Sequence, residues 1–188
     1  MEQHSLAVDP GHAGKIDVTL KDAFRRARRS IEEDFLVRVY VGDVVDPNTG
    51  IFDGAEIGVD FANSLEMSLF VLIHLFGHTV QWNTVPSYRT IDSRVKPGAP
   101  PEVIAESHEY ERNASRLGLS LLHRAGIHDR DEWLADWWAS DWDYLSTYYR
   151  TGALPRWQDC RRHHTGEKLE PMIIPAFTPT RFYARYAF

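Results

Sequence analysis

The stretch that decides the fold is the apolar segment of residues 70–82, which reads FVLIHLFGHTVQW. Apolar side chains occur on nearly every side of a helix drawn through residues 64–82. Asn63 followed by Glu66 is a pair typical of a helix start. A helix that is apolar on every side has to lie inside the protein. The sequence therefore predicts a central, buried helix over residues 64–82.

Two histidines, His74 and His78, lie four residues apart on this predicted helix. Side chains at that spacing project from one helix face about a turn apart, which allows two imidazoles to share one zinc ion. An unsatisfied polar group in such an apolar setting costs about 1–3 kcal/mol, so the pair needs hydrogen-bond partners or a metal. We expect His74 and His78 to bind Zn²⁺ or another divalent metal. The alternative is a metal-free helical interaction domain in which the pair is hydrogen-bonded in the core.

A second long helix, predicted from residue 101 to about residue 123, offers a third metal ligand. Glu109 precedes Asn113 by one turn, and both border the apolar stripe of this helix, so that their edge can face the histidines. A carboxylate ligand at Glu109 would leave zinc with an open fourth position, and Asn113 could fix the tautomer of a ligand histidine. Glu106 and Glu111 compete for the ligand role, although Glu111 is expected to point toward solvent. The remaining alternatives are His108 or no third ligand at all.

The other elements surround this pair of helices. We expect an amphipathic helix over 19–34 that starts at Thr19, a meander of two or three short strands within 37–60, an irregular connection over 83–101 and a tryptophan-rich helix over 130–150. The fold class is thus α+β, with a small sheet packed on the buried helix. Residues 1–152 form the domain, and residues 153–188 form an extended C-terminal tail in which prolines forbid long regular structure.

Residues 35–122 resemble the ImmA/IrrE-type zinc metallopeptidases, small enzymes with a minimal zincin-like fold. The segments that carry the resemblance are GAEIGVD at 54–60, FVLIHLFGHTVQW at 70–82 and EYERNASRLGLSLL at 109–122. The resemblance implies a zincin-like α+β fold. It also implies that His74 and His78 are the histidine ligands, that Glu109 is the glutamate ligand and that Asn113 supports one of them.

One position departs from the family pattern, because Leu75 stands where these enzymes carry their catalytic glutamate. A positioned acid or base contributes about 10²–10⁴-fold to a rate, so weak or absent peptidase activity is expected, as in a regulatory or binding module. The alternative is an active zinc hydrolase with a substitute base. The candidates for that base are Glu106, His108, His163 and His164.

Composition excludes several other classes of protein. Cys160 is the single cysteine in 188 residues, which rules out an internal disulfide framework and a cysteine zinc cluster and fits a cytoplasmic location. The longest apolar run, residues 68–76, has about half the ~18 residues of a membrane span. The net charge of −6 disfavours nucleic-acid binding.

The tail is basic although the chain as a whole is acidic. Seven of the 21 lysines and arginines, but only three of the 27 acidic residues, fall within 150–188. Electrostatic attraction should therefore draw the tail onto the body or onto an acidic protein or peptide partner. That partner can be a second copy of the chain in a homodimer. We expect its apolar residues, Phe177 among them, to dock on the face of Trp133, Trp137 and Trp138.

Overall fold

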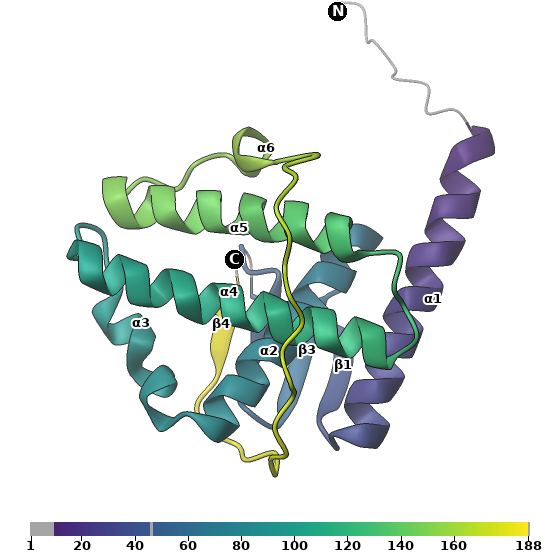
Figure 1. The fold of residues 1–188 in the computed structure, drawn as a ribbon, viewed down its shortest axis with the longest axis horizontal. Coiled ribbons are helices and arrows are strands. Elements are labelled where there is room, and N and C mark those ends of the chain that lie inside the picture. The colour runs from purple at the N-terminus through teal and green to yellow at the C-terminus, as the bar shows by residue number, and fades with distance from the viewer. Residues whose placement is uncertain (1–9, 46, 188) are drawn as a thin grey trace, which may run out of the picture.

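The computed structural model describes residues 10–45 and 47–187, which form a small mixed α+β fold (Figure 1). The larger helices are α1 (Pro10–Asp34), α2 (Leu65–Thr84), α4 (Pro101–Arg124) and α5 (Asp131–Thr151). The strands are β1 (Arg38–Gly42), β2 (Gly50–Phe52), β3 (Glu56–Asp60) and β4 (Arg185–Ala187). The short elements are the 3₁₀ helix η1 (Pro86–Thr90), α3 (Ile91–Arg94) and α6 (Trp157–Cys160). Among the described residues, no helix has both the length and the apolar character needed to cross a membrane.

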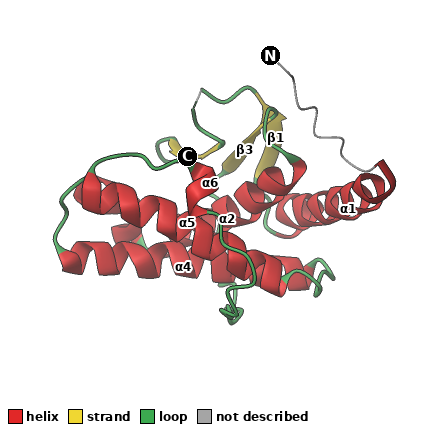
Figure 2. Ribbon diagram, turned by 90° about the horizontal axis from the view of Figure 1, so that it is seen from above, coloured by secondary structure: helices red, strands yellow, loops and turns green. Residues whose placement is uncertain are grey.

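The predicted buried helix is α2, which lies between the sheet and α4 (Figure 2). Every residue of α2 from Leu69 to Trp82 is buried. Its N-cap is Ser64, whose Oγ accepts a hydrogen bond of 3.1 Å from the backbone amide of Met67, whereas the side-chain amide of Asn63 donates to the carbonyl of Thr49. Serine is a preferred N-cap because its hydroxyl satisfies an amide that has no partner in the helix.

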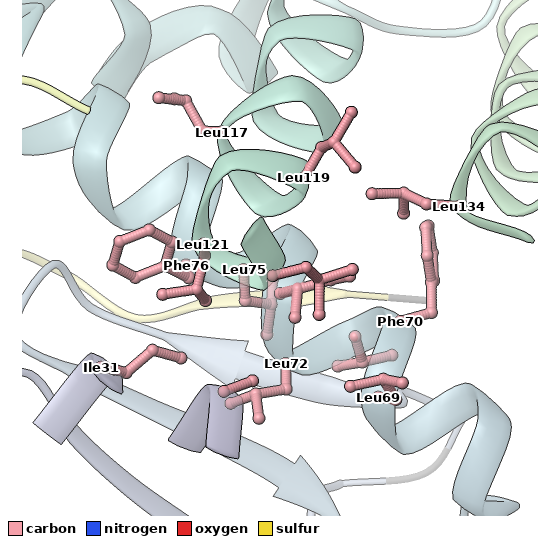
Figure 3. Packing of buried hydrophobic residues seen from close by; sticks show 14 of the residues in the cluster. Ile31, Leu69, Phe70, Leu72, Leu75, Phe76, Leu117, Leu119, Leu121 and Leu134 are labelled. Carbon is pink, nitrogen blue, oxygen red and sulfur yellow. The ribbon is translucent and has the colours of Figure 1, made fainter. Parts of the chain in front are cut away.

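The core surrounds α2 on several sides (Figure 3). Figure 3 labels core residues from four helices, among them Ile31 of α1, Leu72 and Phe76 of α2, Leu121 of α4 and Leu134 of α5. The backbone of α1 is helical from Pro10, nine residues before Thr19, so the predicted start of this helix is wrong.

The sheet has the order β1-β3-β2-β4, and this order is not the expected meander. β2 and β3 form an antiparallel hairpin, but β1 pairs in parallel with β3. The ends of β1 and β3 are held together because the carboxylate of Asp60 accepts a 2.7 Å hydrogen bond from the amide of Val44, and the amide of Phe61 donates to the carbonyl of Gly42. The last strand, β4, comes from the C-terminal tail and pairs antiparallel with β2.

Two glycines allow α2 and α4 to pack backbone to backbone. A Cβ atom at Gly77 would overlap the backbone of Ala114, and one at Gly118 would lie 2.9 Å from the carbonyl oxygen of Ile73. Real Cβ atoms do not approach so closely, so only glycine permits this crossing. The crossing sets which face of α4 meets the histidine face of α2.

The tail lies on the body along most of its length (Figure 1). Its first part reaches the tryptophan face, where the ring of Trp157 lies 5.6 Å from that of Trp137. The expected docking of Phe177 on that face is wrong: its ring stacks on Phe35 at 5.9 Å, after the tail has crossed α4 through hydrogen bonds of Met172 with Ser120. The tryptophan rings are already occupied by α5 neighbours and α6, so the apolar part of the tail continues to the end of α1.

Candidate metal centre

Three buried side chains from α2 and α4 converge on one point. The Nε2 atoms of His74 and His78 lie 2.9 Å apart, and Oε2 of Glu111 lies 3.1 Å from the first and 2.9 Å from the second. His74 is 6% exposed, His78 3% and Glu111 2%. These three residues form a group that could hold a metal ion.

The remaining ring nitrogens of the two histidines have partners of their own. Nδ1 of His74 lies 3.1 Å from Oγ of Ser115, and Nδ1 of His78 lies 2.9 Å from Oε1 of Gln81. The amide nitrogen of Gln81 donates to the carbonyl of Tyr110 at 2.7 Å, so the Gln81 oxygen faces His78 and can only accept. His78 therefore donates from Nδ1, and its Nε2 lone pair points at Glu111.

This tautomer places two acceptors, Nε2 of His78 and the Glu111 carboxylate, 2.9 Å apart in a buried site. Burial lowers the pKa of His78 to about 4, so that its ring is neutral at pH 7. Burial also opposes the charge on His74, but its hydrogen bond to Glu111 and the charges of Asp141 and Glu111 raise its pKa. Burial opposes the ionisation of Glu111, but its electrostatic interactions and hydrogen bonds with the two histidines outweigh that burial and hold its pKa well below the usual range. The facing acceptors thus favour a positive charge between them, which a proton on His74 or a metal cation can supply.

The structure corrects the expected third ligand. Glu109 points to solvent with its side chain 56% exposed and lies 3.3 Å from His108, whereas Glu111, expected at the surface, faces the histidines. The reason is the close crossing of α2 and α4. Small residues face α2 at positions three, four and seven after Glu111, namely Ala114, Ser115 and Gly118. That small-residue spacing, together with Gly77 on α2, is the sequence signal that could have identified Glu111.

The other predicted residues do not join the site. Oδ1 of Asn113 accepts a 3.0 Å hydrogen bond from Arg116, and Ser115 contacts His74 in its place. Arg94 donates two 2.6 Å hydrogen bonds to Glu106, which lowers the pKa of that carboxyl at the surface. The ring of His108 lies against Trp142 at 4.7 Å. The remaining two candidates for a base, His163 and His164, are exposed in the tail.

A carboxylate that the sequence did not single out lies beside the histidines. Asp141 of α5 is 8% exposed, and its Oδ2 lies 3.9 Å from Nε2 of His74. Burial raises its pKa to about 7, helped by the charge of Glu111 and opposed by that of His74. Its signal in the sequence is an acid on the apolar stripe of α5, four residues after Trp137 and four before Leu145.

The site opens on a pocket of about 460 Å³ between the helices and the sheet. α5 contributes Tyr144, Leu145 and Tyr148 to the lining, and the tail contributes residues 183–187, Arg185 and Ala187 among them. The guanidinium of Arg185 donates to the hydroxyl of Tyr110 at 3.0 Å and lies 3.7 Å from Oε1 of Glu111. Leu75 also lines the pocket and is 1% exposed, packed toward Gly50 of β2.

The raised pKa of Asp141 predicts a pH-dependent stability of the metal-free protein. The carboxyl titrates near 7 when folded and near ~3.9 when unfolded, so the folded state holds the extra proton between these values. The free energy of unfolding should therefore fall as the pH rises from about 4 to about 7. Asp141→Asn is expected to remove about 2–4 kcal/mol of that fall, as the size of the pKa shift implies. Urea unfolding of both proteins with chelator present, at pH 5 and pH 8, measures it; equal pH dependence in the two proteins would contradict the assignment.

Comparisons of the chain with protein-family models, curated proteins and solved structures returned no match, so the resemblance to the ImmA/IrrE-type metallopeptidases stays a prediction.

Proposed function

We propose that this protein binds one divalent metal ion through Nε2 of His74, Nε2 of His78 and Oε2 of Glu111, and that Zn²⁺ is the preferred ion. The observation that carries the proposal is the Gln81 contact, which turns the His78 lone pair toward a carboxylate 2.9 Å away. Ligand histidines in proteins commonly donate their second ring N–H to such a partner. Imidazole nitrogen and carboxylate oxygen are donors that suit zinc.

Zinc binding is tested on purified full-length protein that has been stripped with a chelator and dialysed. Calorimetric titration with Zn²⁺ should give about one ion per chain, and elemental analysis should find the same after removal of free metal. A ligand present at ~1,000 times its Kd adds about 4 kcal/mol of stability, so the melting temperature should rise by about 10 °C. A protein that retains no metal and shows no such rise would contradict the proposal.

In this proposal the protein has low peptidase activity even when its metal is bound. Zinc lowers the pKa of a water ligand to about 7, but a peptidase also needs a group that takes up and relays the proton. Leu75, at the family's glutamate position, packs toward β2 and cannot serve. The function that follows is a metal-holding binding or regulatory module in a zincin-like fold.

An active zinc hydrolase is the second candidate, and Asp141 is the observation that favours it. Its carboxylate lies in the same pocket, 3.9 Å from Nε2 of His74, and could take up a proton there in place of the missing glutamate.

Under this candidate the wild type would cleave peptide or amide substrates, and chelator would stop the cleavage. Asp141→Asn should then lower the rate at least about 100-fold while zinc content stays at one per chain. Asp143→Asn is a suitable control, because Asp143 pairs with Arg162 at the surface. Cleavage unaffected by Asp141→Asn would exclude Asp141 as the base.

A further inference from the structure

The end of the tail runs along β2 and covers the metal pocket. We call residues 180–187 the strap. The amide of Phe182 donates to the carbonyl of Asp53 at 2.7 Å, and the amide of Thr49 donates to the carbonyl of Ala187 at 2.8 Å. The strap is thus held to the chain at both ends of β2.

The strand register decides which strap residues face the metal site. Arg185 is paired with Phe52 and Ala187 with Gly50, and both partners lie on the α2 side of the sheet, where Phe52 is 2% exposed. Because side chains alternate along a strand, Tyr186 points to the opposite side, where it is 41% exposed. Arg185 therefore reaches Glu111, and the strap forms one wall of the pocket.

The strap is held less firmly than the other walls. α2, α4 and α5 belong to the hydrophobic core, whereas β4 is a three-residue strand at the edge of the sheet. The rest of the strap is attached by a few side-chain contacts: Arg181 pairs with Asp53 at 2.8 Å but is 62% exposed, Phe182 packs under the guanidinium of Arg89 at 4.0 Å, and the ring of Tyr183 lies 4.9 Å from that of Trp82. Segments with few buried contacts open at the lowest free energy.

The three donor residues are at most 6% exposed and line the pocket of which the strap forms one wall, so release of the strap would widen the way by which an ion or a ligand reaches them. We propose that release of the strap from β2 is the movement that opens the metal site and controls exchange of its metal. This inference rests on the proposed function, since it concerns the same site.

A reversible crosslink between strap and sheet tests the movement in the full-length chain. Ile51 and Tyr186 are direct partners in the register of β2 and β4, and paired positions on neighbouring strands lie within reach of a disulfide. Ile51 lies near Gly58 and Tyr40, on the face away from α2, so Ile51→Cys with Tyr186→Cys leaves Arg185 and Ala187 in place. All proteins compared carry Cys160→Ala to avoid mispairing.

Zinc is loaded into the reduced double variant, half of the sample is oxidised, and release of zinc to excess EDTA is followed in both halves. The oxidised protein should release zinc at least about tenfold more slowly, and TCEP should restore the faster rate. The single variant Ile51→Cys, treated in the same way, should show no difference between the two conditions. Equal release rates in a double variant shown to be crosslinked would overturn the role of the strap and leave zinc binding intact. A failure of the reduced protein to take up zinc would overturn the proposed function as well.

Discussion

Replacing Glu111 with Gln is expected to weaken Zn²⁺ binding by far more than about 100-fold, the upper range for loss of a residue that merely supports a ligand. Glutamine keeps the size of the side chain and its hydrogen-bonding capacity but removes the negative charge that lies 2.9 Å from His78. Competition against a chelating dye measures the affinity of the variant and of the wild type. The double variant His74→Ala, His78→Ala should lose stoichiometric zinc altogether.

Glu109→Gln is the matched control for this experiment. Glu109 lies on the same helix two residues earlier, with its side chain 56% exposed, so its replacement should leave zinc affinity unchanged. The pair of variants separates the ligand set seen in the structure from the one expected from the sequence. If Glu109→Gln lost zinc and Glu111→Gln kept it, the arrangement of α4 described above would be wrong.

Gly77→Ala should destabilise the protein by about 3 kcal/mol or more, at the upper end of what overpacking costs. Elsewhere in a helix the same substitution stabilises by roughly 0.5–1 kcal/mol, because glycine loses more conformational freedom on folding. At Gly77 the new methyl group would overlap the backbone of Ala114, so α4 has to move away from α2. Urea unfolding of the metal-free proteins measures the change.

The same displacement should lower zinc affinity, because Glu111 and Ser115 move with α4 while the histidines stay on α2. Gly118→Ala is the graded comparison: its methyl group would meet the carbonyl oxygen of Ile73 at 2.9 Å, a milder conflict, and the loss of stability should be smaller. A stabilised Gly77→Ala protein would show that the two helices do not cross as closely as described.

The sequence by itself determined the local features of this protein. The all-round apolar pattern predicted the buried helix that the structure shows as Leu65–Thr84, and Pro101 and Gly152 mark the predicted limits of α4 and α5 within a residue or two. The spacing of His74 and His78 placed both rings on one face, and their Nε2 atoms lie 2.9 Å apart. These features depend on helical periodicity and on chain-breaking residues, which act over a few positions.

Only the tertiary structure decided what meets that histidine face. The choice of Glu111 over Glu109 depends on the rotation of α4, which is set by contact of Gly77 with Ala114 across two helices. Asp141 lies beside His74 although 67 positions separate them in the sequence. β4 pairs with β2 across an even longer stretch of chain. Local patterns can mark such residues, as the small-residue spacing of α4 and the acid on the α5 stripe do, but they do not give the partner that each residue meets. That partner is set by packing between elements far apart in the chain.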